Sequence, residues 1–113
     1  MAKTKNENYL DKIPYRPDFI GWKADKNSVV TLEIENKGIF NLIAQKLLKK
    51  PKISYVHLDE LGSFVWTNMD GVRNIAELAE DVKAKFGDAA NPLYERLAKY
   101  FQILKSYNFV VLN

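Results

Sequence analysis

The side chains that could carry out catalysis are few and scattered in this sequence. His57 is the single histidine and there is no cysteine, so a zinc site would depend on one imidazole and carboxylates, without the HxxxH or HExxH spacing. The serines lack the context of a nucleophile elbow, and the glycines lie too far apart to form a phosphate-binding loop. Neighbouring carboxylates such as Asp59 and Glu60 point to different faces of a helix. The sequence therefore predicts a protein that is not an enzyme and holds no metal or other cofactor.

Composition favours one small domain of ordinary type. The chain has 113 residues, of which 47% are hydrophobic and 27% are charged, and a chain of this length suits one core rather than two. The polar N-terminus has no apolar region of the kind that secretory signals contain. No apolar run approaches the roughly 20 residues that span a bilayer. We therefore expect a cytoplasmic protein without a membrane partner.

The net charge of +3 is unevenly distributed along the chain. Residues 1–52 carry eleven Lys and Arg against six Asp and Glu, whereas residues 53–113 carry six against eight. The first part is therefore basic, with a net charge of +5, and the second part is slightly acidic, with a net charge of −2. This asymmetry bears on whether the second part could bind nucleic acid.

The elements that must position any binding residues begin with strands. In residues 28–35, Val30, Leu32 and Ile34 alternate with residues of the opposite face, which is typical of a half-buried strand. Residues 19–24 precede a turn sequence at 25–27, so these two segments predict an antiparallel hairpin.

Residues 53–59 alternate in the same way and predict a third strand. Val56 and Leu58 are expected to face the core, and this places Ile53, Tyr55 and His57 on the opposite face. Residues 39–48, which precede this strand, have helical spacing, and Pro51 follows shortly after them as a helix-stopping residue. They predict a short inserted helix that covers one side of the sheet.

The remainder of the chain has the pattern of three helices. Asp59 is a candidate N-cap for a helix over 60–69, which Asp70-Gly71 ends. Asn74 and Glu77 form a near capping box for a second helix that Gly87 closes. Asn91 and Pro92 are expected to be the N-cap and first residue of a third helix that runs to about Tyr107. It should bury Leu93, Leu97, Tyr100, Phe101 and Leu104.

This order predicts an α+β fold that is winged helix-turn-helix-like: a small three-stranded antiparallel sheet followed by three helices, with the short inserted helix before the third strand. We expect residues 1–14 to be a flexible polar tail and residues 15–113 to form the domain.

At this point the residues carry a family resemblance. The stretch 56–78, VHLDELGSFVWTNMDGVRNIAEL, resembles the core signature of the PqqD family. The matching features are the end of a strand, a helix with a small residue and a bulky apolar pair, a turn, and a helix start. They correspond here to Leu58-Asp59, Gly62 with Val65-Trp66, Asp70-Gly71, and Asn74-Ile75-Ala76-Glu77-Leu78. Arg16-Pro17 and the strand pair also fit, so the resemblance covers about residues 15–112.

The resemblance implies a non-catalytic peptide-binding module, often called a RiPP recognition element. In the family, such a domain holds the leader of a ribosomally made precursor peptide as an added strand and presents it to a modifying enzyme, commonly a radical-SAM protein. Carried onto this chain, the binding edge is 53–58 and the groove wall is the exposed side of the helix 92–107. The residues implied for peptide binding are Ile53, Tyr55, His57, Arg96, Lys99, Tyr100 and Ile103. For Tyr100 and Ile103, core packing is the alternative role, and for Arg96 and Lys99 a solvated face. For His57, the alternative is a half-exposed strand histidine without a binding role.

Segment 38–52 is longer than the turn usual in short members of the family. It could cover the binding edge, or it could extend the groove wall with Lys49, Lys50 and Lys52. The resemblance therefore predicts the fold more firmly than the position of the site.

Two other functions compete with peptide binding. A winged helix can read duplex DNA, but residues 53–113 are net negative where a DNA reader concentrates positive charge, so nucleic acid is disfavoured as a partner. A structural or regulatory subunit that docks through the 39–48 helix is the other alternative. The sequence indicates no oligomeric state, client peptide or partner enzyme.

Overall fold

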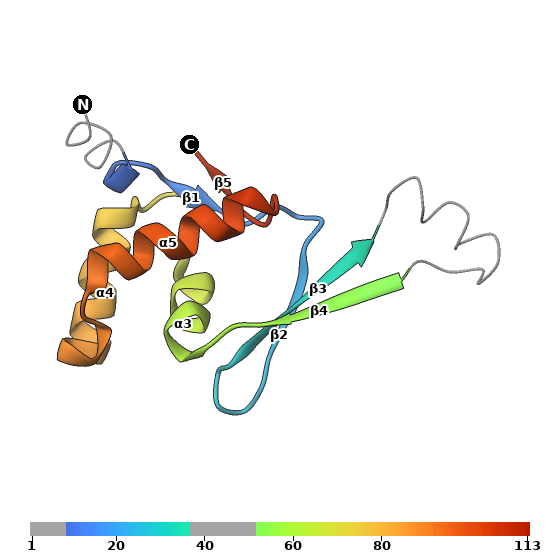
Figure 1. Cartoon of the computed structure of the whole chain (residues 1–113), viewed down its shortest axis with the longest axis horizontal. Coiled ribbons are helices and arrows are strands. Elements are labelled where there is room, and N and C mark those ends of the chain that lie inside the picture. Colours follow the sequence, from blue (N-terminus) through green and yellow to red (C-terminus); the bar gives the residue numbers. More distant parts are fainter. Residues whose placement is uncertain (1–8, 37–51) are drawn as a thin grey trace.

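The computed structural model of the chain describes residues 9–36 and 52–113. The described elements follow the order strand, strand, strand, strand, then three helices and a final strand (Figure 1). They are β1 (Pro14–Tyr15), β2 (Gly21–Ala24), β3 (Val30–Asn36), β4 (Lys52–His57), α3 (Glu60–Asn68), α4 (Ile75–Phe86), the 3-10 helix η1 (Gly87–Ala90), α5 (Leu93–Ser106) and β5 (Val111–Leu112). The predicted α+β fold, with a three-stranded antiparallel sheet and three helices, is confirmed.

The main sheet has the strand order β2-β3-β4, and both pairs are antiparallel. The predicted turn between β2 and β3 forms because the Asp25 carboxylate accepts hydrogen bonds from the backbone N–H groups of Asn27 and Val29. A carboxylate that binds its own following backbone is a common way to fix a tight turn. β4 then returns beside β3, with Leu32 opposite Val56.

The core lies between one face of this sheet and the helices. Val30 and Leu32 of β3 are fully buried, as the alternating pattern predicts. They meet buried side chains from all three helices, of which the largest are Trp66, Ile75, Leu78, Leu97 and Phe101. In Figure 1 the helices gather at one end of the molecule, and the far ends of β3 and β4 project away from them.

Local capping fixes the first two helices where the sequence predicts them. The Asp59 carboxylate accepts a hydrogen bond of 2.7 Å from the Gly62 N–H at the start of α3. Asn74 and Glu77 form the complete capping box of α4, and Gly87 follows its last residue with a positive φ of 57°. Each cap satisfies backbone groups that a helix end leaves unpaired.

The start of α5 differs from the prediction. Pro92 has an extended backbone, with φ −79° and ψ 106°, and is the N-cap, so the helix begins at Leu93. The preceding η1 brings the chain into α5 directly from the end of α4. Prolines favour the first turn of a helix, but here the extended ψ of Pro92 places it just outside that turn.

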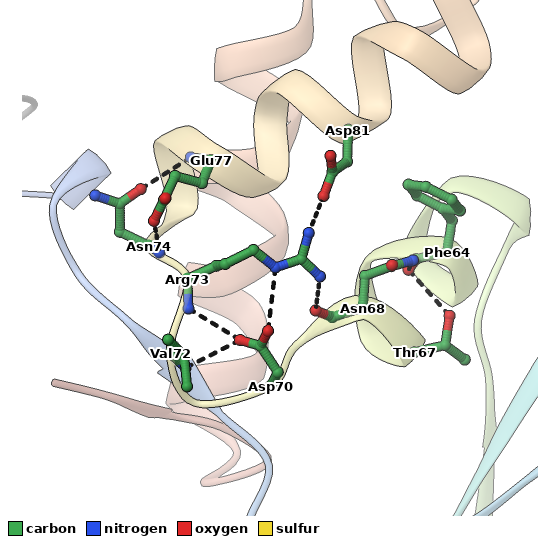
Figure 2. A network of polar contacts seen from close by, with 9 residues as sticks. All are labelled: Phe64, Thr67, Asn68, Asp70, Val72, Arg73, Asn74, Glu77 and Asp81. Carbon is green, nitrogen blue, oxygen red and sulfur yellow. Dashed lines mark hydrogen bonds and ion pairs between the residues drawn. The ribbon is translucent and has the colours of Figure 1, made fainter.

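A network around Arg73 joins α3 to α4 (Figure 2). The Arg73 guanidinium contacts the carboxylates of Asp70 and Asp81 and donates a 2.7 Å hydrogen bond to the Asn68 carbonyl at the end of α3. Asp70 also accepts hydrogen bonds from the backbone N–H groups of Val72 and Arg73, and these bonds hold its pKa below the ordinary value. The network therefore fixes the turn between the two helices.

A buried serine connects the main sheet to α3. The Val30 N–H donates to the Ser63 hydroxyl oxygen at 2.8 Å, and this hydroxyl lies 3.5 Å from the Leu58 carbonyl, to which it donates. The Leu58 N–H in turn donates to the Val30 carbonyl at 2.9 Å. Ser63 is thus part of the last rung between the strands, which explains why a polar side chain lies in the core.

A second, two-stranded sheet joins distant parts of the chain. β1 pairs with β5, and Ile13 exchanges two backbone hydrogen bonds with Asn113. Tyr9 packs against the core and donates its hydroxyl hydrogen to the Ala98 carbonyl of α5. The packed part of the chain therefore includes residues 9–14, which lie before the domain boundary expected at residue 15.

The inserted helix expected at 39–48 lies outside the described residues. The likeness to a winged helix stays a prediction, because sheet and helix content alone fit several α+β arrangements.

Candidate functional site

The site begins with the backbone of β4. In an antiparallel pair, residues alternate between those whose N–H and C=O groups face the partner strand and those whose groups face away. The bond from the Leu58 N–H to the Val30 carbonyl fixes the alternation. The backbone groups of Ser54 and Val56 therefore face β3, whereas those of Ile53, Tyr55 and His57 face outward. Within the described part of the chain, β4 pairs with β3 alone, so these outward groups have no strand partner among the described residues. Most of segment 38–52, which could cover or extend this edge, lies outside them.

The side chains of β4 divide between two faces. Val56 and Leu58 are partly buried and pack against the core, as predicted. Ile53, Tyr55 and His57 are exposed on the opposite face, and the Tyr55 side chain is the most open of the apolar ones, at 60% exposure for the residue. His57 is fixed by a contact of 2.9 Å between its Nδ1 and the Thr31 hydroxyl.

A largely apolar groove of about 340 Å³ lies between β4 and α5. We call it the β4 groove. One wall is formed by Val56 and by Leu58, which directly follows the strand, and the remaining lining comes from α5 and the residues after it. The lining residues are Val56, Leu58, Tyr100, Ile103, Leu104, Tyr107 and Phe109. Ile103 and Tyr107 are 48% and 64% exposed, so apolar surface is open to solvent beside an available strand edge.

Tyr107 and Phe109 shape the end of the β4 groove that lies farther along α5. Their rings stack with centroids 5.4 Å apart. The Phe109 N–H donates to the Leu104 carbonyl at 2.8 Å, and this bond turns the chain back after the helix. The β1–β5 pairing that follows anchors the same segment. This end of the groove is therefore held by the terminal segments of the domain.

Tyr100 closes the end of the β4 groove nearest α3. Its hydroxyl donates a 2.8 Å hydrogen bond to the Gly62 carbonyl. Burial, and to a smaller extent the Asp59 carboxylate, raise the pKa of Tyr100, so the hydroxyl remains a donor. With its polar atom bound to α3, the ring offers only apolar surface to the groove.

The structure brings together some of the predicted site residues and separates others. Tyr100 and Ile103 line the β4 groove, and the edge strand lies next to it. The Arg96 guanidinium instead donates to the Ala89 carbonyl at 3.0 Å, and this bond ties it to η1. Lys99 is exposed and lies outside the groove lining.

Sequence reasoning did not select five residues of the groove lining, which are Val56, Leu58, Leu104, Tyr107 and Phe109. The inward alternation of β4 already marks Val56 and Leu58 as groove-facing. Tyr107 follows Tyr100 and Ile103 at helical spacings of seven and four, so it lies on the same side of α5. Phe109 gives no such signal, because its place depends on the turn after the helix.

The β4 groove offers apolar side chains, and the strand edge beside it offers backbone hydrogen-bonding groups. Over the described ranges 9–36 and 52–113, no group of three or more His, Cys, Asp or Glu is placed to hold a metal ion. No helix in this part of the chain is long and apolar enough to cross a membrane. A bare strand edge beside an apolar groove can accept an extended chain, with backbone bonds for affinity and side-chain contacts for selectivity.

Comparison with known proteins identifies a matching family. Residues 29–110 match the family model described as coenzyme PQQ synthesis protein D (PqqD). This range includes β3, β4 and all three helices, whereas β1, β2 and β5 lie outside it. No curated protein and no solved structure matches the chain. A family of coenzyme synthesis proteins is consistent with a non-catalytic accessory role in biosynthesis. Because the match spans well over half of the chain, the protein belongs to the PqqD family.

Proposed function

We propose that this protein is a non-catalytic accessory module that holds the leader of a ribosomally made precursor peptide and presents it to a modifying enzyme. The observation that carries the proposal is the juxtaposition of the outward edge of β4 with the β4 groove. Family membership supports an accessory role in biosynthesis. A radical-SAM protein is the class of modifying enzyme that we propose as the partner.

The geometry suggests how the peptide would lie. An extended peptide, which we call the guest strand, would pair with the backbone groups of Ile53, Tyr55 and His57 and become a fourth strand. Neighbouring residues in a sheet share a face, so guest residues opposite Val56 and Leu58 would point into the β4 groove. We therefore propose that the guest has apolar residues at every second position over this stretch.

The remaining predicted residues have supporting roles in this proposal. The side chains of Ile53, Tyr55 and His57 would contact the alternate guest residues on the outer face of the sheet. Lys99 stays exposed on α5, from where it could attract an acidic guest residue. Arg96 is assigned a weaker role, because its guanidinium is already bound to Ala89.

Amide chemical shifts can test the proposal. The protein labelled with ¹⁵N would be titrated with a synthetic leader peptide encoded beside its gene. The amides of Ile53, Tyr55 and His57 should shift most, together with residues 100–109, because guest carbonyls would accept bonds from the outward N–H groups. A peptide of the same composition in scrambled order serves as the control. Shifts that are confined to β2, or that the scrambled peptide reproduces, would contradict the proposal.

Duplex DNA binding through α5 is the competing hypothesis. Residues 53–113 contain six Lys and Arg residues. Two of them, Arg73 and Arg96, are already bound to protein groups, and phosphate binding needs free cations. A gel shift with duplex DNA at low and high salt separates the two functions. A salt-sensitive shift without any response to the leader peptide would favour DNA binding.

A further inference from the structure

A glycine at the start of α3 controls how closely α5 approaches. A Cβ atom built on Gly62 would lie 3.0 Å from Cε1 of Tyr100 and 2.9 Å from the Oδ1 atom of Asp59. Both distances are shorter than ordinary contacts between carbon and its neighbours. The absence of a side chain at this position therefore lets the Tyr100 ring lie directly against the first turn of α3.

The same glycine is bound through both of its backbone groups. Its N–H donates to the Asp59 carboxylate at 2.7 Å, and its carbonyl accepts from the Tyr100 hydroxyl at 2.8 Å. The Tyr100 ring also packs edge-on against Phe101, with centroids 5.1 Å apart. Tyr100 is therefore fixed from both sides, and its position is a property of the fold rather than of a mobile side chain.

The fixed ring lies where a guest side chain would enter. Tyr100 lines the β4 groove together with Leu58, which is separated from Gly62 by only three residues of chain. Ile103 and Tyr107 follow one and two turns further along α5. The Leu58 end of the groove is thus bounded by the Tyr100 ring, and the other end is bounded by Tyr107 and Phe109.

From these contacts we propose that Tyr100 is a specificity-determining residue, which sets the size of the guest side chain admitted beside Leu58, and that Gly62 positions it. This inference rests on the proposed function. Any displacement of the ring away from α3 is a displacement into the groove, because the ring lies between the two. A side chain at position 62 should therefore shrink the space beside Leu58, whereas a smaller residue at position 100 should enlarge it.

The experiment uses peptides selected by the protein itself. A library of random twelve-residue peptides displayed on yeast would be selected on the wild-type protein, and one selected sequence would be synthesised. In this peptide, the apolar position that fits beside Leu58 would be located by alanine substitution and then made either Val or Phe. The measured quantity is the ratio of the two affinities, Phe peptide to Val peptide.

Two substitutions should change this ratio in opposite directions. Tyr100→Leu should raise it at least tenfold, and Gly62→Ala should lower it. Tyr94→Leu is the matched control, because Tyr94 belongs to the same helix but lines a different hollow, and it should leave the ratio unchanged. A purely structural role would weaken both peptides by the same factor, so the ratio separates specificity from damage to the fold.

The outcomes distinguish the two levels of the proposal. If the wild-type protein selects peptides but both variants keep its ratio, the role of Tyr100 is wrong while peptide binding stands. If the wild-type protein selects no peptide, the proposed function itself is contradicted and the inference falls with it. Should Tyr100→Leu fail to fold, two other variants still decide the question. Gly62→Ala should lower the ratio of affinities, and Tyr100→Phe, which keeps the ring, should leave it unchanged.

Discussion

The two outer edges of the main sheet have the same backbone chemistry but different surroundings. On the β4 side, six residues form the strand and the outward groups belong to Ile53, Tyr55 and His57. On the β2 side, four residues form the strand. The hydrogen bond from the Asp25 N–H to the Val29 carbonyl fixes the alternation there, so the outward groups are those of Trp22 and Ala24.

Each edge has a hollow beside it, and the two hollows differ in character. The β4 groove is lined almost wholly by apolar side chains. The hollow beside β2, of about 320 Å³, includes the charged side chains of Arg16, Asp18 and Asp70 in its lining. The Arg16 guanidinium lies over the Trp22 ring at 5.1 Å and donates to the Trp66 carbonyl, so it occupies part of the approach to β2.

Side chains, rather than backbone groups, therefore distinguish the edges. β2 carries Lys23, whose Nζ lies 3.5 Å from the Glu33 carboxylate, and a lysine on a short edge strand is a common protection against unwanted pairing. β4 is longer and exposes Ile53 and Tyr55 instead. The difference supports the proposal that the guest binds at the β4 edge rather than the β2 edge, because an apolar groove adjoins β4.

The largest expected effect comes from removing one outward N–H from β4. The same change on β2 is the control. Tyr55→Pro should weaken guest binding roughly 100-fold, because an unpaired buried carbonyl in the guest costs about 1–3 kcal/mol. The fold should survive, since proline is tolerated where the N–H does not face a partner strand. Ala24→Pro removes the equivalent N–H from β2 and should leave binding unchanged. Calorimetric titration of both variants with a selected peptide would measure the contrast, and equal losses would contradict the assignment of the site to β4.

The next largest effect concerns the rung that Ser63 completes. Ser63→Ala should destabilise the fold by about 1–3 kcal/mol, because the Val30 N–H would be buried without an acceptor. Hydrogen exchange should accelerate at Val30 and Leu58, on the β4 side of β3. The β2 side, measured at Lys23 and Thr31, should respond only through global unfolding. Denaturant titration measures the free energy of unfolding. Faster hydrogen exchange at Lys23 and Thr31 than at Val30 and Leu58 would contradict the prediction.

A smaller effect is expected in the β4 groove itself. Ile103→Ser should weaken guest binding about tenfold, because it removes part of the roughly 1.5–3 kcal/mol that a buried isoleucine contributes. Stability should change by only about 0.5 kcal/mol, since Ile103 is half exposed in the free protein. Val72→Ser alters an apolar residue of 73% exposure outside the groove and is the matched control. Fluorescence anisotropy of a labelled peptide would measure both variants, and an unaltered Ile103→Ser affinity would place the peptide elsewhere.

The smallest effect tests the protection of β2. Lys23→Val should raise self-association, because it removes the charge that discourages pairing at this edge. The lost ion pair is exposed and should cost no more than about 1 kcal/mol of stability. Sedimentation velocity at increasing concentration would detect the change, with Lys85→Val on α4 as the control. If Lys23→Val stays as monodisperse as the wild type, the length of β2 rather than Lys23 protects that edge.

Much of this architecture could be predicted because its signals are local. Asp59 and Asn74 are caps whose partners lie within three residues, and the alternation of Val30 and Leu32 reports burial directly. The β1–β5 pair could not be predicted, because two-residue strands have no periodicity and their pairing depends on contacts between the two ends of the chain.

The candidate site follows the same division. The family resemblance implies Tyr100 and Ile103 as binding residues, and both line the β4 groove. The same resemblance implies Arg96 on the exposed side of α5, but its bond to Ala89 depends on η1, which the sequence pattern does not reveal. Phe109 was missed for a similar reason, since the turn after α5 brings it back to the groove. Residues whose position depends on a turn are the ones that local patterns fail to place.

The hydroxyl of Ser63 has a consequence for how the protein opens. It inserts a helix side chain into the hydrogen-bond ladder between β3 and the residue after β4, so α3 cannot detach without also breaking that ladder. The β3–β4 pair and α3 should therefore unfold as one cooperative unit. A guest strand bound at the outward edge of β4 would therefore slow the opening of α3 as well. Binding at the sheet would in this way stabilise the helical end of the molecule.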